Sequence, residues 1–214
     1  MSDRRARPRA GLTRERVVDA ALAFVDEHGI AALSMRKLGT ELGVEAMTLY
    51  HYVPNKEALL DALIDRLVPA LAAIEPEPGE SGQRWLGRVA RAYREQLLAH
   101  PGVLPLAATR PAVSPESLRV AETALRLLEL PPARGLDMVN AVMTFVLGHT
   151  LAEAGRTPGT RSDVDSLAHL DEERFPLLAQ ALRDGPRHGE RFAFALRALL
   201  AGLFATHSRS EASE

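Results

Sequence analysis

The sequence predicts an all-α protein in which an N-terminal three-helix domain of the helix-turn-helix type is joined by a long helix to a second helical domain. Two observations predict this fold. Apolar residues recur at helical spacing along almost the whole chain, and runs of alternating or β-branched residues are scarce. Breaker-rich segments separate the helical stretches, and the most polar of them, residues 75–82, marks the domain boundary.

The composition fits a globular protein. The chain has 214 residues, of which 46% are hydrophobic and 25% charged, with a net charge of −2, and this is enough for one or two domains with a core. The absence of cysteine excludes disulfides and thiolate metal sites. The apolar run at 20–25 is too short for a secretory signal, and the uncharged stretch at 138–152 is too short and too polar for a membrane span. We therefore expect a cytoplasmic protein without a membrane partner.

The first helix is predicted to begin after Thr13, whose hydroxyl suits an N-cap, and to end before Gly29. A helix is expected here because apolar residues repeat at intervals of three and four. The residues predicted to form its inner face are Val17, Ala21, Phe24 and Val25.

Two short helices follow, over residues 34–42 and 45–52, with Gly43 between them. Ser34 is the predicted N-cap of the first. Pro54 ends the second, because the residue before a proline avoids the helical conformation. Such a pair, braced by helices on both sides, is typical of a helix-turn-helix. The residues expected to bury it are Leu38, Leu42, Val44, Leu49 and Val53.

The remaining elements complete two predicted domains, residues 1–55 with the N-terminal tail and residues 74–214. Asn55 is the N-cap of a long helix over 55–73 that links them. In the second domain, the helices are expected at 83–99, from 114 to before Pro131, at 135–155, at 173–183 and at 189–206, with a polar loop between the third and the fourth.

The helix at 45–52 has an outer side suited to DNA. Periodicity puts Thr48 and His51 on the outer side, and hydroxyl and imidazole groups can contact base edges in a major groove. The residues predicted to share the inner face are Ala46, Leu49, Tyr50 and Val53. Lys56, in the first turn of the next helix, lies beside free backbone N–H groups that suit a phosphate. Periodicity alone also fits short helices that merely pack, and it leaves that alternative open.

A spaced set of segments decides between these alternatives. The segments are Ala20-Ala21, 28–30, 34–38, 41–44, 48–50 and 53–61. Together, residues 13–71 closely resemble the DNA-binding domain of the tetracycline-repressor (TetR) family. The resemblance implies an all-α homodimer that binds a palindromic operator through two recognition helices and is released by a small-molecule effector.

The resemblance also implies roles for individual residues. It assigns Thr48 and His51 to base edges, Tyr50, Tyr52 and Lys56 to phosphates, and Arg36 to DNA from the preceding helix. Ala46 and Met47 stand where the namesake of the family has Gln and Pro, so the operator sequence is not inherited. Met47 either meets a thymine methyl group or simply packs.

The resemblance extends more weakly into the second domain, through Trp85 and the segments 107–111 and 145–148. There the namesake binds a magnesium–tetracycline chelate, and its metal ligands correspond to Leu106 and Ala152, the latter one place before Glu153. Apolar side chains cannot ligate a hard cation. We expect no metal and no cofactor, and a shift of one residue in the alignment would restore Glu153.

We expect a largely apolar effector pocket with a few polar groups. The candidate lining residues are Tyr93, Leu106, Thr109, Arg110, Asn140, Met143, Thr144 and His149. Each has a structural alternative: Met143 suits a core, His149 suits a hydrogen-bonded core histidine, and Arg110 suits a bond to helix ends.

Two helices, at about 135–155 and 189–206, are apolar nearly all round, and the family packs the corresponding pair against its symmetry mates as the dimer interface. An enzyme is not expected, because dinucleotide, phosphate-loop and zinc-protease motifs and a nucleophilic cysteine are missing. The prediction is a ligand-responsive, dimeric DNA-binding repressor. The alternative is a helical adaptor or small-molecule-binding protein without operator-specific DNA binding.

Overall fold

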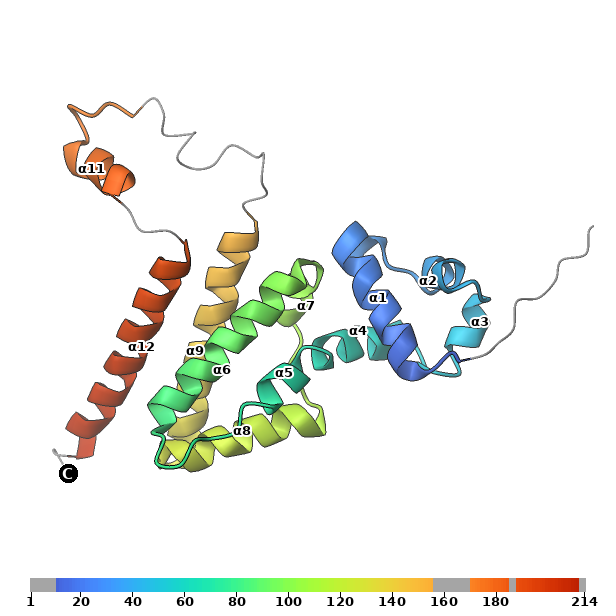
Figure 1. Cartoon of the computed structure of the whole chain (residues 1–214), viewed down its shortest axis with the longest axis horizontal. Helices are drawn as coiled ribbons and strands as arrows, with labels where there is room; N and C mark the ends of the chain where they lie inside the picture. Colours follow the sequence, from blue (N-terminus) through green and yellow to red (C-terminus); the bar gives the residue numbers. More distant parts are fainter. Residues whose placement is uncertain (1–10, 156–169, 185–187, 212–214) are drawn as a thin grey trace, which may run out of the picture. The chain divides into compact units, whose positions relative to one another are not determined.

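The computed structural model describes residues 11–155, 170–184 and 188–211, and these ranges contain helices and no strand (Figure 1). The all-α prediction is therefore confirmed. Contacts divide the chain into two compact units. The first unit consists of residues 1–73 with 99–118, and the second unit consists of residues 74–98 with 119–214.

The elements of the first unit are α1 (Arg14–His28), η1 (Ile30–Ala32), α2 (Met35–Leu42), α3 (Ala46–Leu49), α4 (Lys56–Asp65), α5 (Val68–Ala72), η2 (Pro101–Val103) and α7 (Leu104–Ala107). All three predicted N-caps are confirmed. The side chains of Thr13, Ser34 and Asn55 accept backbone N–H groups at 3.2, 3.3 and 2.8 Å. Gly43 turns the chain between α2 and α3 in the left-handed conformation, with φ of 68°.

The core of the first unit follows the predicted faces. The four inner residues of α1, from Val17 to Val25, are all buried, as are Leu38, Leu49 and Val53. Leu42 and Val44, which were also expected in the core, are only partly buried. The helix-turn-helix therefore rests on α1 and α4 mainly through its central residues.

Two predicted helices are shortened or interrupted in the structure, whereas those expected at 135–155, 173–183 and 189–206 shift by one to five residues at their ends. The helix expected at 45–52 is α-helical only over α3, and it tightens into turns because the N–H groups of both Tyr52 and Val53 bond to the Leu49 carbonyl. The linking helix expected at 55–73 is interrupted after Asp65 and resumes as α5. Pro69 is the reason, because it has no N–H to donate to the carbonyl four residues earlier.

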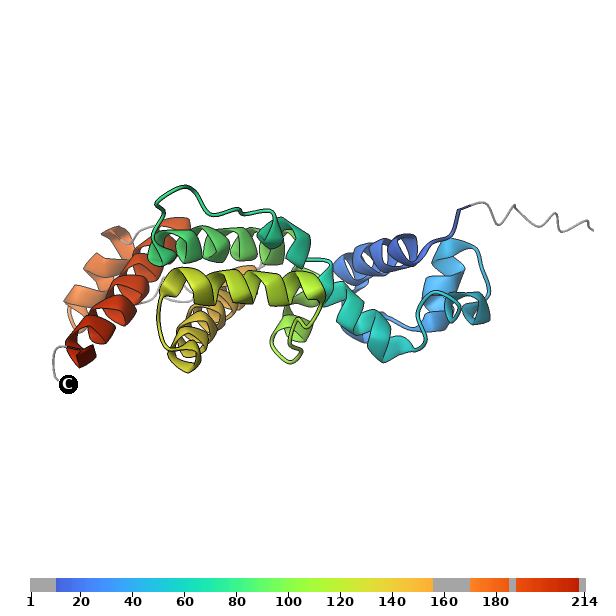
Figure 2. The ribbon, with the colours of Figure 1, turned by 90° about the horizontal axis from the view of Figure 1, so that it is seen from below.

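The second unit contains most of α6 (Gly82–Ala99) and α8 (Pro115–Leu128), together with α9 (Pro132–Ala154), α11 (Pro176–Asp184) and α12 (His188–Glu211). The start of α6 lies beside the end of α8 (Figure 1, Figure 2), so closely that a Cβ on Gly82 would stand 2.5 Å from the Leu127 carbonyl oxygen. A Cβ on Gly87 of α6 would lie 3.4 Å from Leu200 of α12, and α12 also packs along α9.

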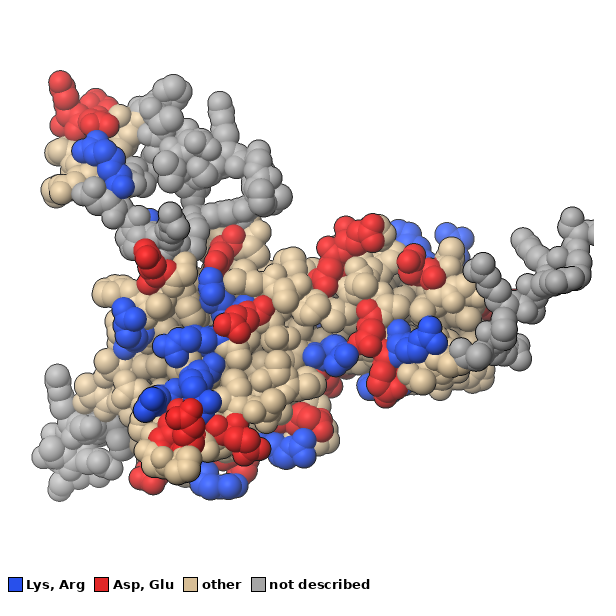
Figure 3. Space-filling model, in the orientation of Figure 1, with Lys and Arg blue, Asp and Glu red and all other residues tan. Residues whose placement is uncertain are grey.

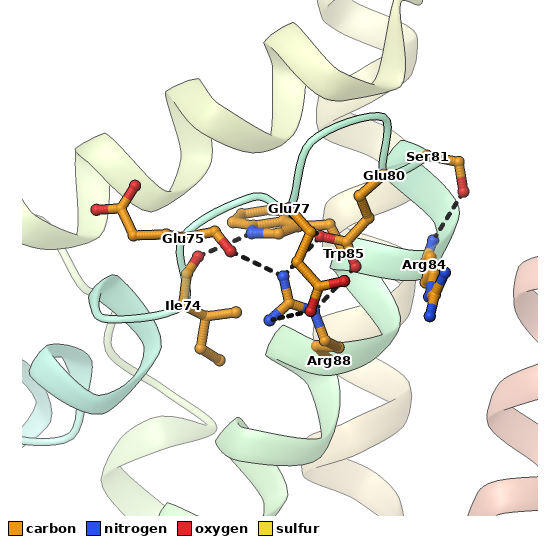
Figure 4. A network of polar contacts seen from close by, with 8 residues as sticks. All are labelled: Ile74, Glu75, Glu77, Glu80, Ser81, Arg84, Trp85 and Arg88. Carbon is orange, nitrogen blue, oxygen red and sulfur yellow. Dashed lines mark hydrogen bonds and ion pairs between the residues drawn. The ribbon is translucent and has the colours of Figure 1, made fainter.

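The polar segment at 75–82 is pinned to the first turns of α6 (Figure 4). Trp85 donates its indole N–H to the Ile74 carbonyl at 2.9 Å, and Arg88 donates to the Glu75 carbonyl at 2.8 Å. Arg88 also forms a double hydrogen bond with Glu80, at 2.9 and 2.6 Å, and the Glu80 side chain is 1% exposed. This guanidinium holds the pKa of Glu80 below its ordinary value. The segment is thus a fixed part of the second unit.

Candidate nucleic-acid interface and ligand-binding unit

The short helix α3 is held firmly on its inner side. Leu49 is fully buried, and Val53 is 1% exposed. A Cβ on Gly39 of α2 would lie 2.8 Å from the Val44 carbonyl oxygen and 3.2 Å from the Ala46 nitrogen, so the backbones of α2 and α3 are in direct contact. This packing fixes the position from which the outer side chains of α3 project.

The outer side of α3 and of the turn after it carries the residues that sequence predicted for DNA. Met47 is 71% exposed, Tyr50 is 41% exposed, and His51 is also exposed. Thr48 and Tyr52 are partly buried, as is Ala46. Tyr50 was expected on the inner face by periodicity, but its exposure agrees better with the phosphate contact that the family resemblance implies.

Basic side chains stand on both sides of α3 along the chain. Arg36 and Lys37 are exposed in the first turn of α2. Lys56, the first residue of α4, donates from Nζ to the Leu33 carbonyl at 2.8 Å. This bond ties the start of α4 to the segment ahead of α2. An ammonium group has three N–H donors, so the bond leaves two of them for a phosphate.

The charge of the molecule does not by itself mark this surface. On the face shown in Figure 3, acidic and basic side chains are interspersed over the described residues. The net charge of −2 agrees with that view. A DNA-binding role therefore depends on where a few basic and polar side chains are placed.

The segment at 99–118 packs on α1, a feature that the sequence did not reveal. His100 Nδ1 lies 2.7 Å from the Asp26 carboxylate of α1, and the same carboxylate accepts the Gly102 N–H at 3.3 Å. A Cβ on Gly102 would lie 2.4 Å from the Val25 carbonyl oxygen. These partners are more than seventy residues apart in the chain, so no local signal announces them.

Arg110, predicted as a ligand residue, is bonded to α4. Its guanidinium pairs with Asp61 at 2.6 Å and with Glu57, and the two carboxylates raise its pKa. Arg110 thus has a structural bond, but to side-chain carboxylates of α4 and not to the end of a helix as the structural alternative supposed. Leu106, at 7% exposure, and Thr109, which bonds to the Pro105 carbonyl at 3.1 Å, also belong to the first unit.

The other five predicted ligand residues belong to the second unit, where one of them has an unusual environment. His149 Nε2 is buried and has no hydrogen-bond partner among the described residues. Its ring lies 5.7 Å from that of Phe145 and 5.2 Å from that of Phe192. Burial raises the pKa of Tyr93, and Met143 is partly buried. The remaining two, Asn140 and Thr144, are exposed on α9.

A charged pair that the sequence did not single out lies beside the same Phe192 ring. Arg94 of α6 binds Glu153 of α9 through two hydrogen bonds, at 3.0 and 2.6 Å, and both side chains are 18% exposed. The Arg94 guanidinium also stands 4.9 Å from the centre of the Phe192 ring. The two residues are 59 positions apart, so no local pattern predicts the pair. In the sequence, Glu153 stands out only because it lies one place after a position that corresponds to a metal ligand.

A bracing helix on each side of a buried α2–α3 pair, with polar side chains projecting from α3, defines a helix-turn-helix DNA-binding regulator. The family model "Bacterial regulatory proteins, tetR family" matches residues 17–63, and the model "Tetracyclin repressor-like, C-terminal domain" matches residues 75–207. The chain belongs to the TetR family of bacterial transcriptional regulators, and it is a regulator rather than an enzyme.

Several relatives align over most of the chain. The class D tetracycline repressor protein of Escherichia coli is 36% identical over 200 residues, which cover 90% of this chain and 89% of the relative. The HTH-type transcriptional repressor DrrR1 of Streptomyces coeruleorubidus is 32% identical over 216 residues, covering 92% and 78%. These alignments take in the helix-turn-helix and the second unit alike.

Solved structures of TetR-family proteins superpose on most of this chain. Apo ActR of Streptomyces coelicolor superposes with a TM-score of 0.79 at 28% identity, over 95% of this chain and 100% of the other. ActR in complex with actinorhodin gives a TM-score of 0.75 at 29% identity, covering 92% and 99%. A single-substitution variant of TetR from Acinetobacter baumannii in complex with minocycline gives 0.70 at 29% identity, covering 91% and 94%.

Proposed function

We propose that this protein is a cytoplasmic transcriptional repressor that binds a palindromic operator as a homodimer and is released by a small-molecule effector. The observation that carries the proposal is α3, whose inner side is locked against α2 while Met47, Thr48 and His51 project outward. A rigid helix with free side chains is what a major groove accepts.

In this proposal Thr48 and His51 contact base edges, and Met47 and Ala46 lie beside them. Tyr50, Tyr52 and Lys56 hold phosphates, and Arg36 approaches the DNA from α2. The phosphate contacts set the register of the protein on the duplex, and the base contacts supply sequence preference. The bond from Lys56 to Leu33 supports this division, because it aims the ammonium group from a fixed point.

The homodimer is proposed to form through α9 and α12. Leu136 and Leu151 of α9 are 46% and 47% exposed, and Phe194 of α12 is 68% exposed. The 23-residue α9 is long and apolar enough to pass for a membrane span, yet only 28% of its most apolar stretch is buried inside the chain. A second copy packed on these helices would cover this apolar surface, as in a family dimer.

The effector is proposed to be largely apolar and to bind without a metal. Among similar solved structures, ActR is in complex with actinorhodin and the Acinetobacter baumannii TetR variant is in complex with minocycline. Within the described ranges, no group of three or more His, Cys, Asp or Glu residues is placed to hold a metal ion. The buried Nε2 of His149, which has no hydrogen-bond partner in the part of the chain that the structure describes, lies between two phenyl rings and supports a contact with an effector oxygen or nitrogen.

The test begins with selection of bound sequences from a random DNA pool, followed by affinity measurements over a series of salt concentrations. Lys56→Ala should weaken binding to every sequence and lower the slope of log affinity against log salt by about one per subunit. A purely structural role for Lys56 would leave that slope unchanged.

Two further variants complete the test. Thr48→Ala should change the DNA sequence that is selected. Arg126→Ala, which removes an exposed arginine side chain on α8, should change neither the selected sequence nor the salt dependence of binding. A chain that enriches no sequence, with a salt slope unaffected by Lys56→Ala, would favour the adaptor alternative.

A further inference from the structure

Met47 places a large apolar side chain in solvent at the reading surface. Among the described residues of the first unit it is the most exposed large hydrophobic residue, at 71%, ahead of Val113 at 63% and Leu118 at 58%. The structure therefore answers the question that the sequence left open, because Met47 does not pack into the core. A thioether side chain held in water, on a helix whose other three residues are buried or partly buried, suits contact with a partner surface.

The position of Met47 is set by the packing beneath it. Ala46, the first residue of α3, is held against Gly39, and Leu49 is fully buried two residues beyond Met47. The backbone under Met47 is therefore fixed on both sides. Ala46 offers only a methyl group, so Met47 is the first long side chain that α3 presents, with Thr48 beside it and the exposed His51 one turn later.

The chemistry of methionine restricts what it can read on DNA. Base edges in the major groove present hydrogen-bond donors, acceptors and one apolar group, the C5-methyl group of thymine. A thioether has no donor and accepts only weakly, so it cannot distinguish the polar edges of guanine, cytosine or adenine. It is flexible and polarisable, and it suits close contact with a methyl group.

We propose that Met47 is a specificity-determining residue that selects thymine in each operator half-site through the 5-methyl group. This inference rests on the proposed function, since it needs an operator. It assigns to Met47 a readout by van der Waals contact, which complements the hydrogen bonds available to Thr48 and His51.

The experiment removes the methyl group from the DNA. Once the operator is selected, each thymine of a half-site is replaced in turn by deoxyuridine, which differs only by that methyl group. For the wild-type protein, replacement at one position of a half-site should weaken binding by about fourfold, as expected for the loss of one buried methyl group. Replacement at the symmetric positions of both half-sites should weaken binding by about sixteenfold. Met47→Ala should bind the thymine operator more weakly and should not distinguish thymine from deoxyuridine at that position.

Two further variants test whether Met47 itself makes the contact with the thymine methyl group. Met47→Leu keeps an apolar side chain and should retain part of the discrimination, while Thr48→Ala tests whether the threonine methyl group makes the contact instead. Because Met47 is so exposed, thermal unfolding of Met47→Ala should match that of the wild type.

The outcomes separate the two proposals. If the wild type binds a selected operator but tolerates deoxyuridine everywhere, or if Met47→Ala keeps the full discrimination, the role of Met47 is overturned and the repressor function stands. If no DNA sequence is selected at all, the proposed function fails, and this inference fails with it.

Discussion

The two units of the chain differ in how completely they cover their apolar residues. In the first unit the inner faces of α1, α2 and α3 are closed by neighbours in the same chain, and the apolar side chains left exposed are few, Met47 foremost. In the second unit, α9 and α12 leave Leu136, Leu151 and Phe194 in solvent. Under the proposed roles, the first unit offers DNA the exposed Met47 of α3, and α9 and α12 offer a second copy their exposed apolar side chains, while Val113 and Leu118 of the first unit are also exposed.

The largest expected loss of stability comes from replacing one glycine in each unit that lies directly against a backbone carbonyl group. Gly102→Ala would bring a Cβ within 2.4 Å of the Val25 carbonyl oxygen, and Gly82→Ala within 2.5 Å of that of Leu127. Since backbone atoms must shift in both cases, we expect each variant to lose about 3 kcal/mol of unfolding free energy. Urea unfolding at one fixed protein concentration measures the loss, because a dimer gains stability with concentration.

The two glycine variants should lose stability in different parts of the chain. Hydrogen exchange should show α1 opening in Gly102→Ala, and the ends of α6 and α8 opening in Gly82→Ala. Gly189→Ala is the control, because nothing lies within 4 Å of a Cβ there, and alanine favours the helix. Wild-type stability in Gly102→Ala would show that the segment at 99–118 is not packed on α1 as described.

A smaller effect is expected from the ion pairs that join distant segments in each unit. Arg94 and Glu153 of the second unit are both 18% exposed and doubly bonded, so Glu153→Ala should cost about 2 kcal/mol. Asp61, which pairs with Arg110 in the first unit, is 55% exposed. Asp61→Ala should cost less, and its cost should vanish in high salt, because water and ions screen an exposed pair.

Thermal and urea unfolding at low and high salt compare the two variants. Glu153→Gln is a useful companion to Glu153→Ala, since it removes the charge and keeps much of the shape. Equal costs for Glu153→Ala and Asp61→Ala, or a cost for Asp61→Ala that persists in high salt, would contradict this ranking.

The sequence was informative wherever the signal was local. Thr13, Ser34 and Asn55 sit directly before apolar periodic stretches, and their caps are formed as predicted. Pro69 was also a local signal, and it explains the break between α4 and α5 that the prediction of one linking helix passed over.

The contacts that sequence could not predict join residues far apart. Asp26 meets His100 across 74 residues, and Arg94 meets Glu153 across 59. Neither pair leaves a pattern in its own segment, because a contact between distant segments is set by how the elements pack and not by spacing along one helix. Arg110 is a similar case. An arginine suits a ligand contact by residue type, but the structure bonds Arg110 to Glu57 and Asp61 of α4, about fifty residues earlier in the chain.

The smallest expected effect concerns the segment that the sequence marked as a domain boundary. Arg88 lowers the pKa of Glu80, so this carboxylate adds stability only while it is ionised in the folded state. That contribution is present above the pKa of an unfolded glutamate, about 4.3, and is lost as the pH falls through the lower folded value. Glu80→Gln, which keeps an acceptor for Arg88, should therefore be slightly less stable than the wild type at neutral pH, and the difference should shrink as the pH falls below the pKa of an unfolded glutamate.

The matched control lies in the same segment. Glu77 is 58% exposed and stands 3.9 Å from the same guanidinium, so Glu77→Gln should change stability less at neutral pH. Urea midpoints of the three proteins across the acid range give the comparison. A gap between Glu80→Gln and the wild type that is constant with pH would contradict the role of the ionised carboxylate, and would leave the segment held by the Trp85 and Arg88 bonds to backbone carbonyls.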